Sequence, residues 1–347
     1  MQESPQILVI RRHYLGDIVL LGSFLRNLRL HRPSALIRVL VEPAYAGVLA
    51  LNPDVDEPLL LPEGVAAWPR FILELRRTRW THVFNLENTE GTALITRLSG
   101  APFRLGLHHG GFPLKFKSCY THIEHDPNEL HESRPITEYF LRALAPAGVP
   151  IATREVRLVP RDDDVAALKR IVGATGPILL VHPGSRSHWR LWPAERFAAV
   201  CDRAQEELGV QVVLVGGPGE RALIESIRKF AHTHLLAFTD PFALTRFAAL
   251  ARLSSVLLCH DSGPMHVAAA VGTPVVALYG SQSSVLFPPA GSGHILLQPS
   301  LPCTECVAPA ECVPLDSYHN QCVRRLTVEA VFAAVSRQFS RLKAPAS

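Results

Sequence analysis

The chain has 347 residues, of which 48% are hydrophobic and 19% charged, a composition typical of globular rather than disordered proteins. With 35 basic and 31 acidic side chains, the formal net charge of +4 is too small to indicate nucleic-acid binding. No apolar run reaches the ~18 residues of a membrane span, and the N-terminus lacks the apolar core of a signal peptide. We expect a cytoplasmic protein with no transmembrane segment and no nucleic-acid partner, and contact with a membrane surface stays open.

Short apolar runs alternate with longer amphipathic segments, which is typical of α/β folds around parallel sheets. The clearest helix of the first half spans residues 17–31, where apolar side chains recur at helical spacing. Strands of this half are expected at residues 6–10, 36–42, 58–62, 81–86 and 104–107.

The apolar rhythm stops at residues 151–176, where prolines and clustered charges predict a linker. Strands are then expected within residues 177–185, 210–217, 234–238, 255–263 and 273–280, with a helix starting at Asp240 and Pro241. The sequence thus predicts domains at 1–150 and 177–325, followed by a C-terminal helix and tail at 326–347. Because ligands bind at the carboxyl ends of parallel strands, the strand-to-helix turns of both domains should face a cleft.

The first such turn, "RRHYLGD", ends in Asp17 at the start of a helix. Asp17 can simply cap the helix, or it can serve as a general base. A helix N-terminus would lower its pKa, and desolvation would raise it. Glu42 falls where the ribose-binding acid of a dinucleotide site would lie, but the turn lacks the paired glycines of that motif.

The second domain begins with the turn "HPGSRSHWRLWP". Gly184 and Ser185 can offer backbone N–H groups, and Arg186 and Arg190 supply positive charge, as a diphosphate site needs. The alternative is a capped turn with solvent-facing arginines and packed tryptophans.

Two later turns carry polar residues in the same position after a strand. Glu220 closes a glycine turn and can accept hydrogen bonds from ribose hydroxyls, or it can belong only to the first turn of a helix. In "DSGPMH", Ser262 and Gly263 offer a hydroxyl and bare amides to phosphate, and Asp261 can bind sugar hydroxyls. Capping by Asp261 or Ser262 is the alternative, with His266 as a buried helix residue.

The chain resembles glycosyltransferase family 9, the lipopolysaccharide heptosyltransferases, from residue 6 to 335. The resemblance rests on the order of these motifs: "LGD", "HPGS", the arginine before "WP", the glycine turn and "DSGPMHVAAAVGTPVVALYG". The resemblance implies the GT-B architecture, with two Rossmann-like α/β domains facing a central cleft. It also implies transfer of L-glycero-D-manno-heptose from ADP-heptose, with inversion and without metal or cofactor. The implied acceptor is the lipopolysaccharide inner core at the inner membrane face.

Matching the motifs residue by residue, the resemblance implies that Asp17 is the base and Arg190 contacts the donor diphosphate. An arginine at 190 where many members have lysine keeps the charge. Ser23 stands where proline is common, which leaves the subfamily open. The implied donor contacts are Ser185, Glu220, Asp261, Ser262, Gly263 and His266.

An anionic core acceptor would suit the basic residues of the first domain. Arg12 and His13 lie in the turn of Asp17, so they are our first candidates for residues that contact the acceptor. The other candidates are Arg11, Arg76, Arg77, Arg79, Arg104, His108, His109, Lys115 and Lys117. A member with another nucleotide sugar or acceptor glycan, or a nucleotide-binding relative without catalysis, remains an alternative.

Four cysteines near the C-terminus follow C-x2-C-x5-C-x9-C spacing. This spacing is compatible with a structural zinc site, with a disulfide, or with reduced packing cysteines. The four residues are Cys303, Cys306, Cys312 and Cys322.

Overall fold

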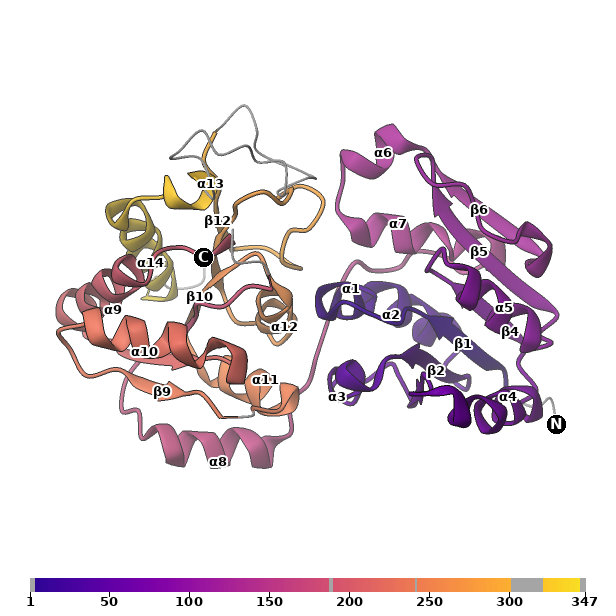
Figure 1. The fold of residues 1–347 in the computed structure, drawn as a ribbon, viewed down its shortest axis with the longest axis horizontal. Helices are drawn as coiled ribbons and strands as arrows, with labels where there is room; N and C mark the ends of the chain where they lie inside the picture. The colour runs from indigo at the N-terminus through magenta and orange to yellow at the C-terminus, as the bar shows by residue number, and fades with distance from the viewer. Residues whose placement is uncertain (1–3, 187–189, 241, 301–320, 344–347) are drawn as a thin grey trace. The chain divides into compact units, whose positions relative to one another are not determined.

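The computed structural model describes residues 4–186, 190–240, 242–300 and 321–343 (Figure 1). The chain divides into two compact units, Met1–Val159 and Pro160–Ser347. The boundary falls within the segment predicted as a linker, and α8 (Asp162–Val172) of that segment packs against α11 (Leu244–Leu253) of the second unit. Each unit is an α/β fold built on one six-stranded sheet.

The sheet of the first unit has the strand order β3-β2-β1-β4-β5-β6, with every pair parallel. Ile10 at the end of β1 lies level with Leu40 of β2 and Asn85 of β4. The strands are β1 (Gln6–Ile10), β2 (Leu36–Val41), β3 (Glu57–Leu60), β4 (His82–Asn85), β5 (Phe103–His109) and β6 (His122–Asp126). The helices are α1 (Leu15–Leu20), α2 (Gly22–His31), α3 (Ala46–Leu49), α4 (Trp68–Arg77), α5 (Glu90–Leu98), α6 (Asn128–Glu132) and α7 (Ile136–Arg142).

The second unit repeats this topology, with the order β12-β11-β10-β7-β8-β9 and all pairs parallel. Cys259 of β10 lies level with His182 of β7 and Ala277 of β11. The strands are β7 (Ile178–His182), β8 (Gln211–Val215), β9 (Leu236–Phe238), β10 (Val256–His260), β11 (Val275–Leu278) and β12 (Ile295–Leu297). Besides α8 and α11, the helices are α9 (Ala194–Leu208), α10 (Arg221–Phe230), α12 (Gly263–Ala270), α13 (Gln321–Arg324) and α14 (Val328–Lys343).

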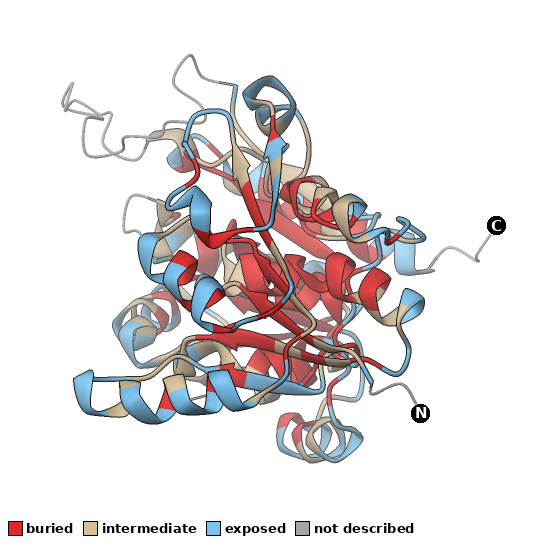
Figure 2. Cartoon of the chain, turned by 90° about the vertical axis from the view of Figure 1, so that its right-hand side faces the viewer, coloured by how far each residue is buried: buried red, intermediate tan, exposed pale blue. Residues whose placement is uncertain are grey.

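The central strands are buried on both faces, which explains why the sequence shows them as continuous apolar runs. Every residue of β7 and β10 is buried, and in β1 only Gln6 is partly exposed. Figure 2 shows buried residues along the strands and exposed residues on the outer faces of the helices. The strand-to-helix turns that carry chemistry therefore start from rigid supports.

All ten predicted strands are present, but the sequence reading missed β6 and β12. Both are edge strands with partly exposed residues, so neither has the apolar run of a central strand. The predicted helix start at Asp240 is wrong, and Pro241 lies outside the described residues. Helix α11 begins at Leu244, and the Asp240 carboxylate instead accepts a hydrogen bond of 2.8 Å from Arg221. Within the described ranges, no helix is both long and apolar enough to cross a membrane.

Candidate functional site

Each sheet has a switch point, where neighbouring central strands lead to connections that run in opposite directions along the sheet. It lies between β1 and β4 in the first unit and between β7 and β10 in the second. In open α/β sheets, ligands bind at the carboxyl ends of the strands at this point. The predicted site residues follow β1, β7 and β10, apart from Glu220, which follows β8 beside β7, so the topology places them where ligands of such folds bind.

In the first unit, Asp17 lies in the first turn of α1 and is 8% exposed. The residue that precedes the helix is Tyr14, and no side chain caps it. The interpretation of Asp17 as a simple cap is therefore wrong. Tyr14 has a φ of 39°, a conformation that costs a non-glycine residue energy and that occurs most often at functional sites.

Arg11 holds the carboxylate of Asp17. Its Nη2 donates to Asp17 Oδ2 at 2.5 Å and its Nη1 donates to the Leu86 carbonyl at 3.1 Å, while the guanidinium lies 5.5 Å from the centre of the Phe140 ring. Burial disfavours the charged guanidinium, but the Asp17 carboxylate, with Glu87 and Tyr139 adding to its effect, raises the pKa of Arg11. Arg11 thus stays charged and fixes the direction of the carboxylate.

Arg12 and His13, the expected acceptor residues, both lie beside Glu87 at the end of β4. Arg12 donates to Glu87 through its backbone N–H at 2.7 Å, its Nε at 3.0 Å and its Nη2 at 2.7 Å. His13 Nδ1 lies 3.5 Å from Glu87 Oε1 and 3.4 Å from Glu42 Oε1. Glu87 is 6% exposed, so it anchors the turn of Asp17 to the neighbouring strand.

In the second unit, the guanidinium of Arg190 lies between two acceptors. Its Nη1 is 3.5 Å from Asp261 Oδ2, and its Nη2 donates to Gln282 Oε1 at 2.9 Å. Trp192 fixes the segment that carries it: its backbone N–H donates to His260 Nε2 at 2.8 Å and its indole to the Leu326 carbonyl at 2.9 Å. The structure thus brings Arg190 to the "DSG" turn, as a diphosphate site requires.

Asp261 is buried, and its Oδ1 has no hydrogen-bond partner in the described part of the chain. Burial raises the pKa of Asp261 to about 7, although Arg190 opposes the shift. Ser262 stands at the N-cap position of α12, but its side chain makes no capping hydrogen bond, and its hydroxyl donates to the His260 carbonyl at 3.3 Å. The predicted capping position of Ser262 is therefore confirmed, while the start of α12 at Gly263 has no side-chain cap.

Glu220 lies against the turn after β7. Its Oε2 accepts a 2.5 Å hydrogen bond from the Gly217 N–H, and its Oε1 is 3.7 Å from His182 Nε2. A Cβ on Gly184 would lie 2.8 Å from Glu220 Cγ and closer still to the carboxylate. Gly184 is needed here because the carboxylate occupies the space of a side chain. Ser185, the next residue, is partly exposed.

Buried polar atoms without a hydrogen-bond partner gather around these turns, among the described residues. Such atoms are rare in native proteins, and a cluster of them indicates a place where a ligand or water completes the hydrogen bonds. His266, on the next turn of α12, is 5% exposed, and burial lowers its pKa to about 4, with His294 adding to the shift. The atoms are His182 Nδ1, Arg190 Nε, His260 Nδ1, Asp261 Oδ1, His266 Nδ1 and Ser281 Oγ.

Sequence reasoning missed Arg11 as the partner of Asp17, Glu87 as the anchor of its turn, and Gln282 with Ser281 at the turn after β11. A signal was present for the last pair, because "YGSQSS" follows β11 directly. Glu87 was not recognisable from local pattern, since its partner Arg12 lies 75 positions away.

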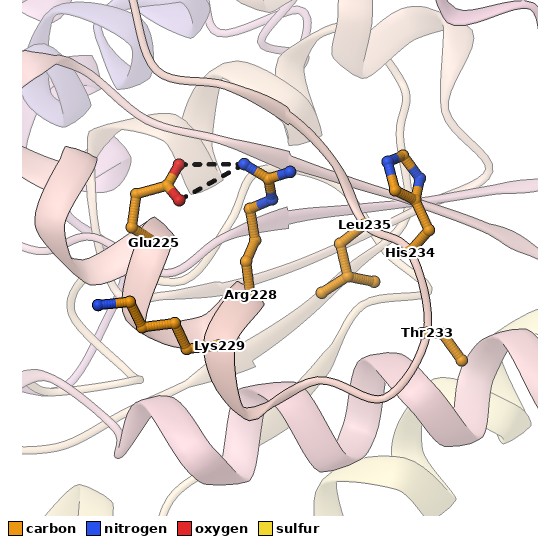
Figure 3. Close-up of a pocket in the computed structure, with 6 residues that line it drawn as sticks. All are labelled: Glu225, Arg228, Lys229, Thr233, His234 and Leu235. Atoms are coloured by element: carbon orange, nitrogen blue, oxygen red, sulfur yellow. Dashed lines mark hydrogen bonds and ion pairs between the residues drawn. The ribbon is translucent and has the colours of Figure 1, made fainter.

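A pocket of 280 Å³ lies elsewhere in the second unit, between the end of α10 and the segment that enters β9 (Figure 3). In it Arg228 is paired with Glu225, beside Lys229 and His234. Because this segment precedes β9, the pocket lies at the amino edge of the sheet, away from the residues discussed above. The residues that line this pocket are not among the predicted site residues.

No group of three or more His, Cys, Asp or Glu side chains in the described ranges is arranged to hold a metal ion. Cys303, Cys306 and Cys312 lie outside those ranges, so the interpretations of the cysteine cluster stay predictions. Cys259 is fully buried in β10.

Two Rossmann-like units in one chain, each with polar residues at its switch point, define the GT-B class of glycosyltransferase folds. Residues 68–313, more than half of the chain, match the model of glycosyltransferase family 9 (heptosyltransferase), and the chain belongs to this family. The matched range includes all the candidate donor residues; Asp17, Arg12 and His13 precede it.

Individual proteins of this kind are similar over most of their length. Lipopolysaccharide heptosyltransferase 3 of Escherichia coli K12 is 26% identical over 295 residues, which cover 80% of this chain and 83% of the relative. The structure of ADP-heptose LPS heptosyltransferase II of E. coli matches with a TM-score of 0.80 and 22% identity, covering 98% of this chain and 100% of that one. A family 9 glycosyltransferase from Veillonella parvula DSM 2008 matches with a TM-score of 0.84 and 23% identity, covering 98% and 99%.

Proposed function

We propose that this glycosyltransferase transfers L-glycero-D-manno-heptose from ADP-heptose to the inner core of lipopolysaccharide, with inversion and without a metal or other cofactor. The observation that supports the donor site is the contact of Arg190 with buried Asp261 and with Gln282, beside unsatisfied polar atoms at the switch point of the second sheet. The names of the E. coli relatives support the sugar and the acceptor. The acceptor implies that the protein works in the cytoplasm at the inner membrane face.

In the proposed donor site, the diphosphate binds beside Arg190 and the uncapped start of α12. A guanidinium and helix N–H groups neutralise an anion and so stabilise ADP as a leaving group. Ser185 contributes a hydroxyl donor to the phosphates, and Ser262 and Gly263 contribute backbone N–H donors. Asp261 and His266 face the sugar, and Glu220 contacts the ribose through the carboxylate oxygen that does not bind Gly217.

In the proposed reaction, a hydroxyl oxygen of the acceptor attacks the anomeric carbon of the heptose. The bond from that carbon to the diphosphate oxygen breaks, ADP leaves, and Asp17 takes the hydroxyl proton. Arg11 holds the Asp17 carboxylate in place during the attack. Arg12 and His13 contact the anionic acceptor, with Glu87 keeping both in position.

The test replaces Asp17 with asparagine and measures both transfer and ADP binding. We expect D17N to lose at least about a hundredfold in kcat, the usual contribution of a general base, and to bind ADP as the wild type does. D240N, which alters a carboxylate that is 88% exposed in the second unit, is the control and should retain activity. Unchanged turnover of D17N would remove Asp17 from the role of base.

The donor assignment has its own test, a thermal-shift comparison of ADP, UDP and NAD. We expect ADP to raise the melting temperature most, because a ligand stabilises the folded state according to its affinity. A larger shift with UDP would indicate a family member that uses another nucleotide sugar. Transfer to defined truncated core acceptors would then identify the acceptor position.

A further inference from the structure

The turn that follows β11 contacts the guanidinium of Arg190. Arg190 Nη2 donates to Gln282 Oε1 at 2.9 Å, while Nη1 lies 3.5 Å from Asp261 Oδ2. Because arginine has only donors, the amide of Gln282 must turn its oxygen toward the guanidinium. Gln282 therefore holds one arm of Arg190, and Asp261 lies near the other.

The turn itself is clamped by the residue after β12. Gln298 Nε2 donates to the carbonyls of Gln282 at 2.8 Å and Gly280 at 3.2 Å, and its Oε1 accepts from the Ser284 hydroxyl at 2.6 Å. These bonds fix the backbone from which the Gln282 side chain extends. An acceptor on a rigid support can set the direction of a long side chain that would otherwise sample many rotamers.

The neutrality of Gln282 matters for an anion site. A second carboxylate at this position, in addition to Asp261, would cancel more of the Arg190 charge that a diphosphate needs, whereas an amide orients the guanidinium without adding negative charge. Two buried donors beside it remain unused within the described structure, Arg190 Nε and Ser281 Oγ. Unused buried donors next to an oriented cation are what the oxygens of a diphosphate would satisfy.

We propose that Gln282 is a positioning residue, which aims the Arg190 guanidinium at the diphosphate of the donor. This inference rests on the proposed function, because it presumes that Arg190 binds that diphosphate. It adds a residue that acts through Arg190, with Gln298 as the support of the turn.

The experiment is a double-mutant cycle in the full-length protein, with the dissociation constant of ADP measured by calorimetry. We expect Q282A to weaken ADP binding by roughly tenfold, the effect of losing one hydrogen bond to a charged group. Q282E should weaken it further, because the new carboxylate pairs with Arg190. In the R190A background, Q282A should cause no additional loss, since there is no guanidinium left to orient.

Two further measurements separate positioning from a general structural effect. Q282A should raise the KM for the donor and leave the KM for the acceptor unchanged, whereas damage to the fold would alter both. Q205A and Q205E are matched controls, because Gln205 makes one long hydrogen bond of 3.4 Å on α9 outside the donor turns. Both should bind ADP normally. If Q282A does not fold, the nearly isosteric Q282E provides the comparison.

The possible failures are distinguishable. If R190A binds ADP as tightly as the wild type, the donor assignment of the proposed function is wrong. If R190A weakens binding but the Gln282 variants do not, or if Q282A weakens binding equally in the R190A background, only the positioning role is wrong.

Discussion

Replacing Gly184 with alanine should destabilise the protein only while Glu220 is present. The new Cβ would lie 2.8 Å from Glu220 Cγ and within the van der Waals radius of the carboxylate. To restore ordinary contact the carboxylate must move by on the order of 1 Å or more, which breaks its 2.5 Å hydrogen bond from Gly217.

The expected cost follows from these two effects. Overpacking at a close contact costs roughly 1–3 kcal/mol, and the lost hydrogen bond to a partly exposed carboxylate adds about 1 kcal/mol. We therefore expect G184A to lower the free energy of unfolding by about 2–4 kcal/mol. E220A removes only the hydrogen bond and should cost about 1 kcal/mol.

The double variant provides the sharper test. Gly184 is outside the left-handed region of φ, so alanine fits its backbone once the carboxylate is gone. In the E220A background, G184A should be neutral or stabilise by up to about 1 kcal/mol, because alanine restricts the unfolded chain. The effect of G184A on the free energy of unfolding thus depends on the residue at position 220: G184A destabilises the protein with glutamate there and does not with alanine.

The assay is urea-induced unfolding followed by tryptophan fluorescence, with G219A as the control. Gly219 has no atom within 4 Å of an added Cβ, so G219A should stay within about 0.5 kcal/mol of the wild type. If G184A costs as much in the E220A background as in the wild type, the close approach of Glu220 is not the reason for the glycine.

Two further predictions concern buried groups at the donor turns. Burial raises the pKa of Asp261 to about 7, so the folded protein holds this proton to higher pH than the unfolded chain and its stability falls as pH rises from about 4 to 7. D261N should therefore gain stability relative to wild type across this range, by at most about 4 kcal/mol; thermal melts at pH 4.5 and 8 that show a constant difference would contradict this. H260F removes the acceptor of the buried Trp192 N–H and should cost about 1–3 kcal/mol and weaken ADP binding through the Arg190 segment. Unfolding and calorimetry check both effects, and full stability of H260F would show that the N–H finds another partner.

The fold class and the turns that carry the polar residues could be predicted from the sequence. Continuous apolar runs such as those of β7 and β10 identify buried parallel strands, because each face of such a sheet is covered. The motifs after those strands were recognisable as candidate ligand-binding turns, because parallel strands present their carboxyl ends at one edge of the sheet. Local pattern was insufficient at the edges of the sheets, where β6 and β12 have partly exposed residues, and at the start of α11.

Which polar side chains contact one another could not be predicted from the sequence, because these contacts form between separate strands of the folded sheet. Arg11 binds Asp17 rather than solvent, and Glu87 reaches Arg12 across 75 positions of sequence because β4 lies beside β1. In the same way the register of β7, β10 and β11 brings Arg190, Asp261 and Gln282 together from three separate turns. Such contacts depend on strand order and register, which are properties of the folded sheet. A sequence pattern can therefore indicate candidate residues, but it does not predict which residues they contact.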